Sequence, residues 1–257
     1  AYLAAKAAYL SGCGLVTLAT IDDVHQALAG VLPEVTWIPL PSKNGFISED
    51  GVPIIQDYLS KSSAILIGPG FGLHPSTEQF LHTLFTNNTE KLPALVIDAD
   101  GLKLLARLEN WPTRLPKNTI LTPHPGEMAV LTQMKTNEIQ LQRVFTAEHY
   151  ANLWNQIVIL KGAFSIIAEP QGRTAMNPIA SSALAKAGTG DVLAGLISGL
   201  RAQGVPAFEA ASMGVYIHGQ AGLYAAQKIG TSRSVLSSDV LNAIPEVFQE
   251  LEKSMKQ

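Results

Sequence analysis

The sequence of 257 residues has little charge and almost no cysteine. Charged residues make up 15% of the chain, and its net charge is −3. Its basic residues do not cluster into a stripe, which argues against nucleic acid or a membrane surface as the main partner. The single cysteine, Cys13, cannot form an internal disulfide and lies in an apolar run. A buried thiol of this kind is typical of a reducing compartment, so we expect a cytoplasmic protein.

Several familiar motifs are also absent. No apolar run reaches the roughly 18 residues of a membrane span, and no signal-peptide pattern is present. The sequence contains no Walker A motif, no G-x-S-x-G elbow and no H-E-x-x-H or C-x-x-C spacing, so the ligands of any metal stay unknown. Residues 67–73, "IGPGFGL", come nearest to a dinucleotide fingerprint. The match fails because Leu73 stands where the third glycine belongs, although a nicotinamide dehydrogenase remains open as an alternative.

Apolar residues, in contrast, are abundant and regularly arranged. They make up 47% of the chain, which predicts a large core and one α/β domain. Short apolar strands alternate with helices, and this order predicts a parallel sheet with helices on both faces. A hairpin with its turn near Gln171 and Gly172 is expected at the sheet edge, and a helical region after Thr189 has Ser238 as a cap and Pro245 at the start of a last helix. The expected strands are 14–20, 35–41, 64–67, 95–97, 119–122 and 157–160.

Polar residues and glycines follow four of these strands where they end. Ligands of open parallel sheets bind outside the carboxyl ends of the strands. Each residue has a structural alternative: Asp98 or Asp100 as a helix cap, His124 as a turn residue, Lys161 reaching solvent. Their convergence on one rim favours a ligand site. The residues are Gly68, Gly70, Gly72, Asp98, Asp100, His124, Glu127, Lys161 and Gly162.

Residues 186–200, "KAGTGDVLAGLISGL", place a glycine turn and one acid before an apolar helix. The backbone N–H groups of Gly188 to Gly190 would be uncovered where the helix dipole is positive, which suits an anion. Asp191 beside them could take a proton from a hydroxyl, and the alternative is that it only caps the helix.

Taken together, "IGPGFG", "VIDADGL", "LTPHPGEMAVL", "LKGA" and "KAGTGDVLAGLISG" stand in an order and spacing that resembles the ADP- or ATP-dependent NAD(P)H-hydrate dehydratase family. The resemblance extends over essentially the whole chain. It implies a ribokinase-like α/β fold, a central, mostly parallel sheet with helices on both faces. It also implies a repair reaction, in which ADP or ATP phosphorylates the C6 hydroxyl of hydrated NADH or NADPH and loss of phosphate restores the reduced cofactor.

The resemblance also implies roles for individual residues. Asp191 would be the catalytic base, the backbone of Gly188 and Gly190 would stabilise the transferred phosphoryl group, and the donor implies Mg²⁺. The hydrated cofactor would contact Gly70, Gly72, Asp98, His124 and Asp191. The adenine nucleotide would contact Lys161, Gly162, Ala163, Phe164, Ser165 and Gly190.

The chain departs from the family pattern in two places. That pattern begins with a further strand and a glycine turn ahead of the helix at 1–12, so we expect one ribokinase-like domain over 1–257 that lacks them. Lys186 and Ala187 stand where the family often has two glycines. Many relatives carry an epimerase domain in front, which makes an NAD(P)H-hydrate epimerase a candidate partner, fused or separate. Small residues at 207–228 permit a homo-oligomer.

Two other functions remain open. A ribokinase-fold kinase of a small hydroxymethyl vitamin precursor would use the same base and anion hole, and His124 in its "HPGE" turn favours the dehydratase. A nucleotide-binding protein without catalysis is the other. The sequence leaves open ADP or ATP as donor, and NADH hydrate or NADPH hydrate as substrate.

Overall fold

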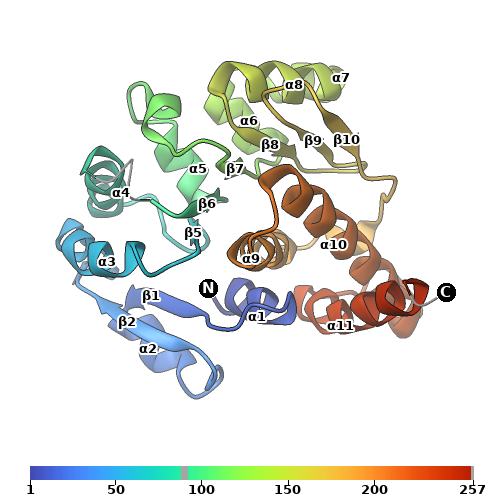
Figure 1. The fold of residues 1–257 in the computed structure, drawn as a ribbon, viewed down its shortest axis with the longest axis horizontal. Helices are drawn as coiled ribbons and strands as arrows, with labels where there is room; N and C mark the ends of the chain where they lie inside the picture. The colour runs from blue at the N-terminus through green and yellow to red at the C-terminus, as the bar shows by residue number, and fades with distance from the viewer. Residues whose placement is uncertain (88–91, 256–257) are drawn as a thin grey trace.

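The computed structural model describes residues 1–87 and 92–255. A six-stranded sheet with the order β10-β9-β8-β7-β6-β5 forms its centre (Figure 1). Neighbouring strands from β5 to β8 are parallel, and β9 and β10 are antiparallel at the edge, which confirms the mostly parallel sheet and the edge hairpin. The strands are β5 (Ala64–Ile67), β6 (Ala94–Ile97), β7 (Ile120–Leu121), β8 (Ile157–Leu160), β9 (Ile166–Ala168) and β10 (Thr174–Met176).

Both faces of this sheet are covered by helices. Alternate side chains of a strand point to opposite faces, so Leu95 and Ile97 join one apolar cluster while Val96 joins the other. One cluster includes side chains of α3 (Val52–Leu59), α4 (Pro75–Asn87), α5 (Asp100–Leu105), α6 (Pro125–Thr132), α7 (Thr136–Leu141) and α8 (Arg143–Trp154). The other includes side chains of α9 (Thr189–Ala202) and α10 (Ala207–Ile229).

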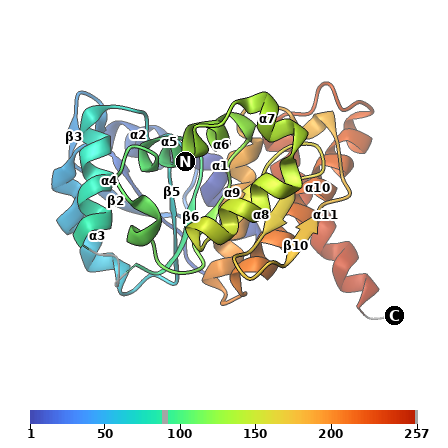
Figure 2. The ribbon, with the colours of Figure 1, turned by 90° about the horizontal axis from the view of Figure 1, so that it is seen from above.

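A second helical layer is formed by α1 (Tyr2–Leu10) and α11 (Ser237–Ser254), which lie side by side against α9 and α10 in Figure 1. In Figure 2, α1 lies near the middle of the molecule and α11 at one end. The expectation for the last helix was wrong in detail. Pro245 lies inside α11 rather than at its start, and Ser238 is in the first turn. Asp239, not Ser238, bonds the helix end, since its Oδ2 accepts the N–H of Leu236 at 2.8 Å.

The N-terminal strands form a sheet of their own. Strands β1 (Thr17–Ile21) and β2 (Thr36–Leu40) pair in parallel around α2 (Asp22–Leu28) and are followed by the hairpin β3 (Ser42–Lys43) and β4 (Phe46–Ile47). Ile21, Ile38 and Leu40 pack into the same apolar cluster as the central sheet. The strands expected at 14–20 and 35–41 are therefore present, but outside the six-stranded sheet. Short 3-10 turns cover Glu49–Gly51, Trp111–Arg114 and Ser182–Leu184.

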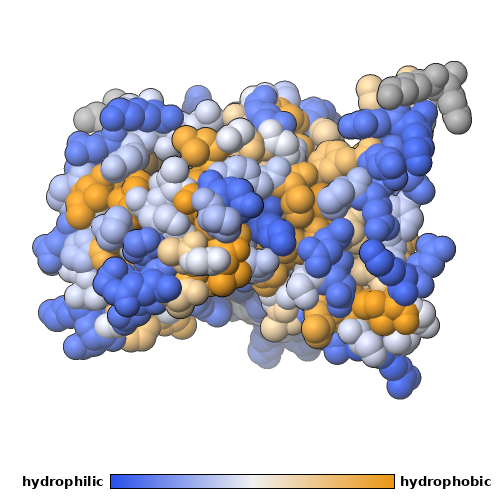
Figure 3. All heavy atoms as spheres, turned by 90° about the horizontal axis from the view of Figure 1, so that it is seen from below, coloured by the Kyte–Doolittle hydropathy of each residue, from blue (hydrophilic) through white to orange (hydrophobic). Residues whose placement is uncertain are grey.

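The surface is mixed in character. On the face shown in Figure 3, hydrophobic side chains are interspersed with hydrophilic ones. No helix in the described part of the chain combines the length and the apolar character that crossing a bilayer requires.

Glycines of α9 allow α1 to approach closely, and this contact yields a prediction. A Cβ added at Gly195 would lie 2.1 Å from the carbonyl oxygen of Ala4. We therefore expect Gly195→Ala to lower the free energy of unfolding by about 2 kcal/mol, measured by urea denaturation. Gly30→Ala is the control, because nothing lies within 4 Å of its added Cβ. Equal stabilities for the two variants would contradict the close packing of α1 on α9.

Candidate active site

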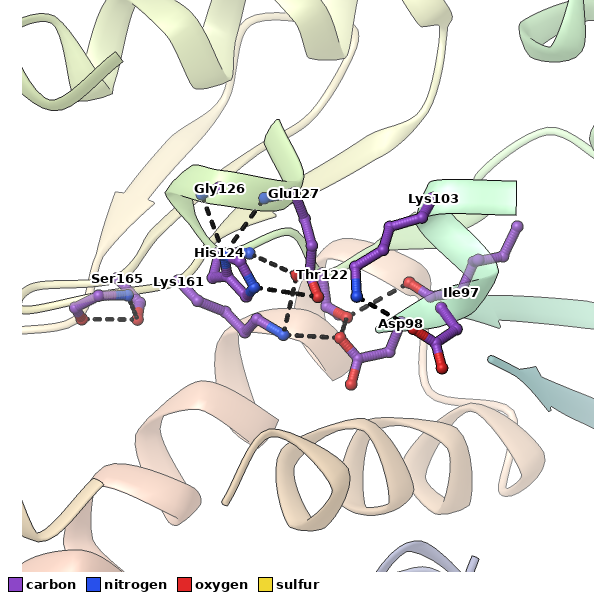
Figure 4. A network of polar contacts seen from close by, with 11 residues as sticks. Ile97, Asp98, Lys103, Thr122, His124, Gly126, Glu127, Lys161 and Ser165 are labelled. Atoms are coloured by element: carbon purple, nitrogen blue, oxygen red, sulfur yellow. Dashed lines mark hydrogen bonds and ion pairs between the residues drawn. The ribbon is translucent and has the colours of Figure 1, made fainter. Parts of the chain in front are cut away.

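A buried ion pair lies at the carboxyl ends of β6, β7 and β8, as Figure 4 shows. Lys161 follows β8, and its Nζ lies 2.6 Å from Oδ1 of Asp98, which follows β6. The same Nζ is 3.5 Å from Oε2 of Glu127, in the first turn of α6 after β7. The side chains of Asp98 and Glu127 are only 2% and 5% exposed. Three residues expected at one rim from the sequence are thus in mutual contact.

Hydrogen bonds and opposite charges stabilise the ionised groups of this cluster. Thr122 Oγ1 donates to Asp98 Oδ1 at 2.7 Å. Burial by itself would lower the pKa of Lys161, but the attraction of Asp98 and Glu127, together with their hydrogen bonds, raises it above its usual value. Lys161 therefore stays protonated in the folded protein.

His124 is the cap of α6. Its Nδ1 accepts the N–H groups of Gly126 at 3.0 Å and Glu127 at 3.2 Å, and Glu127 Oε2 accepts the N–H of His124 at 2.8 Å. Burial lowers the pKa of His124, which favours the neutral ring. Since Nδ1 accepts two bonds, we assign the proton to Nε2, which lies 3.2 Å from Glu127 Oε1. The side chain is 52% exposed, so the capped imidazole still faces outward.

Ala99 separates two acids that serve different contacts. Its φ of 51° is positive, which is uncommon for alanine, and it turns Asp98 and Asp100 to different partners. Asp100 Oδ2 accepts the N–H of Gly72 at 3.0 Å, and Oδ1 pairs with Lys103 at 3.0 Å. Ala99 itself is the cap residue of α5, without a side-chain cap bond, so the capping alternative for Asp98 and Asp100 was wrong.

The glycine turn after β5 is packed tightly against the start of α5. A Cβ at Gly68 would lie 1.9 Å from the carbonyl oxygen of Asp98, so this position admits only glycine. Gly70 has open space around an added Cβ, whereas a Cβ at Gly72 would contact the Phe46 ring at 2.6 Å. Gly72 is linked to the start of α5 by its N–H bond to Asp100.

Asp191 lies in the first turn of α9 beside the same cluster. Gly188, with φ 86°, is the cap residue, so the interpretation of Asp191 as the helix cap was wrong. Burial raises the pKa of Asp191 most, and the charges of Asp98 and Asp100 raise it further, while Lys161 lowers it. A Cβ at Gly190 would be 3.4 Å from Lys161 Nζ and 3.8 Å from Asp98 Oδ2. The start of α9 therefore lies directly against the ion pair.

The turn 161–165 is closed on itself. The N–H of Gly162 donates to Ser165 Oγ at 3.3 Å, and that hydroxyl donates to the Gly162 carbonyl at 3.1 Å (Figure 4). Ala163 and Phe164 are exposed at its tip. The Lys161 side chain does not belong to this turn, because it points to Asp98.

Two contributors were missed from the sequence. Arg143, the first residue of α8, donates to the carbonyls of Leu160 at 3.1 Å and Lys161 at 3.4 Å. No local pattern signals this contact, because the partners are 17 and 18 residues apart. Thr122 was missed as well, although its place at the end of β7, between an apolar strand and the "PHPGE" turn, could have indicated it.

Magnesium would find oxygen ligands here but no dedicated cage. Within residues 1–87 and 92–255, no group of three or more His, Cys, Asp or Glu side chains is arranged to hold a metal. Asp98 Oδ2 faces Gly190, whereas Oδ1 accepts Lys161 and Thr122. Magnesium is commonly bound by one or two carboxylates together with substrate phosphates, so this site fits it in that manner.

Fold and site together define a class: an α/β protein in which a helix begins after a glycine and carries an acid in its first turn, at the carboxyl ends of parallel strands. The fold is ribokinase-like. A ribokinase-like superfamily protein of Enterococcus faecalis superposes with a TM-score of 0.80 at 24% identity, over 96% of this chain and 81% of that one. The family model of NAD(P)H-hydrate dehydratase matches residues 1–246, and the chain belongs to this family.

Individual relatives agree with this assignment. The chain is 38% identical to a bifunctional NAD(P)H-hydrate repair enzyme of Moorella thermoacetica, over 99% of this chain and 47% of the relative. It is 32% identical to the ADP-dependent (S)-NAD(P)H-hydrate dehydratase of Neisseria meningitidis, over 98% and 81%. The chain spans about half the length of several such bifunctional relatives.

A solved structure of the family is similar throughout. The ADP/ATP-dependent NAD(P)H-hydrate dehydratase of Bacillus subtilis, co-crystallised with ATP and Mg²⁺, superposes with a TM-score of 0.80 at 29% identity. The match covers 96% of this chain and 85% of that one.

The ion pair yields a stability prediction. Lys161→Met leaves Asp98 and Glu127 buried without their cation, so we expect a loss of about 3 kcal/mol in the free energy of unfolding. Lys103→Met is the matched control, because the more exposed pair of Lys103 with Asp100 contributes about 1 kcal/mol or less. Guanidinium unfolding at neutral pH measures both. Similar losses for the two variants would show that the Lys161 pair is not the stronger interaction.

Proposed function

We propose that this chain dehydrates hydrated NADH or NADPH, using ADP or ATP as phosphoryl donor and Mg²⁺ as cofactor. The observation that carries the proposal is the position of Asp191, in the first turn of α9 and against the cluster of Lys161 and Asp98. Gly188 is the N-cap residue of α9, without a side-chain cap bond, and Asp191 follows it in the first turn. The family assignment and the ATP/Mg²⁺ of the Bacillus subtilis structure support the choice of reaction and donor.

In the proposed reaction, the Asp191 carboxylate takes the proton of the C6 hydroxyl. That oxygen forms a bond to the terminal phosphorus of the donor while the bond from this phosphorus to the leaving nucleotide breaks. The backbone N–H groups of Gly188 and Gly190 stabilise the charge on the phosphoryl oxygens. The phosphate then leaves the ring carbon together with a proton from the neighbouring carbon, which restores the double bond of the reduced nicotinamide.

The two ligands are assigned to opposite sides of Lys161. The hydrated-cofactor side would be lined by Gly70, Gly72, Asp98 and His124. Two contacts support this side: Asp100 accepts the N–H of Gly72 at the start of α5, and the exposed His124 ring lies beside Glu127. The turn from Lys161 to Ser165, with Gly190, would hold the adenine nucleotide. A neutral His124 suits hydrogen bonding to a sugar or amide group.

The setting of the enzyme is also a proposal. We infer a cytoplasmic protein, with an NAD(P)H-hydrate epimerase as its partner, fused or separate, because bifunctional repair enzymes are among its relatives. Gly214, Gly219 and Gly222 of α10 pack inside the chain against its own side chains. A homo-oligomer would therefore use exposed side chains of this helix, such as Tyr216 and Leu223.

The domain is the last part of the proposal. Strand β5 ends the six-stranded sheet, and β1 pairs with β2 in a separate one. In Figure 1, β5 and β1 lie on the same side of α9. We propose that residues 1–257 belong to one ribokinase-like domain, in which a further strand beside β5 and β1 would join the two sheets and add a wall to the substrate site.

Asp191→Asn tests the reaction. Hydrated NADH, MgCl₂ and ADP or ATP are mixed with the protein, and the absorbance of reduced nicotinamide is followed. We expect the variant to lose about 100-fold or more of the turnover and to keep nucleotide binding. Folding raises the pKa of Asp191, so the ionised carboxylate destabilises the folded state once the pH exceeds the pKa of an unfolded aspartate. Asparagine carries no charge, and the Tm of the variant at pH 7 should therefore be at least that of the unmodified protein. Normal turnover in the variant would refute the mechanism.

The pH profile supplies a second test. The base acts as a carboxylate, so kcat/KM should fall on the acid side with an apparent pKa above that of an ordinary aspartate. The kinase alternative is examined in the same reaction, by product analysis with a hydroxymethyl pyrimidine or thiazole in place of the hydrated cofactor. A stable phosphorylated product there, without restored nicotinamide from the hydrate, would favour the kinase.

A protein that carries additional residues ahead of Ala1 tests the further strand beside β5 and β1. We expect a lower KM for the hydrated cofactor, because the added turn would line that side of the site, and a higher Tm, because β5 and β1 would both gain a partner. The unextended chain is the control. An extension that changes neither quantity would remove this part of the proposal.

A further inference from the structure

Two described residues have a positive φ that neither their residue type nor the C-terminus of a helix explains. Four of the seven non-glycine residues with positive φ are asparagines, which tolerate this region, and Gln133 ends α6. The remaining two are Ala99 and Phe164. Both follow strands of the central sheet at the rim that holds the candidate site. Backbone strain of this kind gathers at functional sites.

Phe164 is the more unusual of the two, because a bulky aromatic residue rarely has a positive φ. Leu160 of β8 pairs with Ile166 of β9, so residues 161–165 form a five-residue hairpin loop. Glycine or asparagine normally supplies the positive φ of such loops. Here a phenylalanine adopts φ 56°, and its side chain remains 47% exposed. Neither a favourable backbone conformation nor burial in the core therefore explains a phenylalanine at this position.

The loop beneath this ring is held in place. Gly162 has φ 147°, and a Cβ there would lie 2.6 Å from Nη1 of Arg143. The Arg143 guanidinium donates to the carbonyls of Leu160, the last residue of β8, and of Lys161, the first residue of the loop. Ser165 and Gly162 are hydrogen-bonded to each other across the turn. The aromatic side chain is thus presented to solvent from a fixed base, next to Lys161.

We propose that the Phe164 ring is the surface on which the purine base of the phosphoryl donor stacks, and that it sets the preference for adenine over pyrimidine nucleotides. The inference rests on the proposed function, which assigns the donor to residues 161–165. Stacking requires a flat, exposed apolar ring on a rigid support, and a purine offers it a larger face than a pyrimidine does. A stacking role would explain why a phenylalanine with a positive φ stands here. Glycine or asparagine would adopt this φ at a lower energetic cost, but neither has an aromatic ring.

Direct binding tests the inference without turnover. Binding of ADP and CDP in MgCl₂ is measured by calorimetry, with no hydrated cofactor present. We expect Phe164→Ala to weaken ADP binding by about 5- to 30-fold and CDP binding by less, while Phe164→Tyr keeps both. Phe145→Ala is the matched control, since Phe145 is 60% exposed on α8 outside the loop. An equal loss for ADP and CDP, or none, would overturn the inference.

Stability separates this role from a structural one. Phe164→Asn relieves the left-handed backbone, so it should melt at the same or a higher temperature while binding ADP more weakly. A lower Tm with unchanged ADP affinity would mean that the ring only supports the fold, and the inference would fail.

A fluorescent variant reports contact with the base. In Phe164→Trp, ADP should quench the added indole emission, and in Phe145→Trp it should not. A protein that binds ADP through residue 164 but restores no nicotinamide would keep this inference and lose the proposed function. A protein that binds neither ADP nor ATP would lose both.

Discussion

The ion pair between Lys161 and Asp98, shared with Glu127, is the interaction on which the site depends. Its members come from the ends of β6 and β8 and from the helix after β7, so it joins three neighbouring strands at one edge of the sheet. A buried charge without its partner costs several kcal/mol, and the three groups must therefore stay together. Thr122 completes the cluster by donating to the Asp98 oxygen that also accepts Lys161.

Helix α9 connects this cluster to the rest of the molecule through glycines. Gly190 lies over the Lys161 ammonium, and Gly195 lies against the backbone of Ala4 in α1. A side chain at Gly195 would clash with Ala4, whereas a Cβ at Gly190 would only be in van der Waals contact with the Lys161 ammonium. The close approach of α1 at Gly195 therefore helps to fix the position of α9, and with it Asp191, which we propose as the base.

The sequence predicted the fold well where patterns are local. Continuous apolar runs such as Ile157–Leu160 end in polar residues, and parallel strands bring these ends to one edge, so Asp98, His124 and Lys161 were found together. Long-range contacts could not be predicted. Arg143 donates to carbonyls that are 17 and 18 residues away. The separate β1-β2 sheet was also missed, because a strand pattern does not say which strands pair, and here β1 does not pair with β5. Pro245 was misread because proline is common at helix starts, whereas α11 continues through it.

The charges around Asp191 also explain how a buried acid could serve as a base. Burial and Asp98 favour its protonated form, and Lys161 opposes them. Lys161 and Asp98, whose charged atoms are 2.6 Å apart, act on Asp191 in opposite directions, and burial is the largest cause of its raised pKa. A phosphate group entering beside Gly190 would add negative charge near the carboxylate and raise its affinity for a proton further. Binding of the donor would therefore strengthen the base at the moment when a hydroxyl proton has to be taken, provided the carboxylate is ionised beforehand.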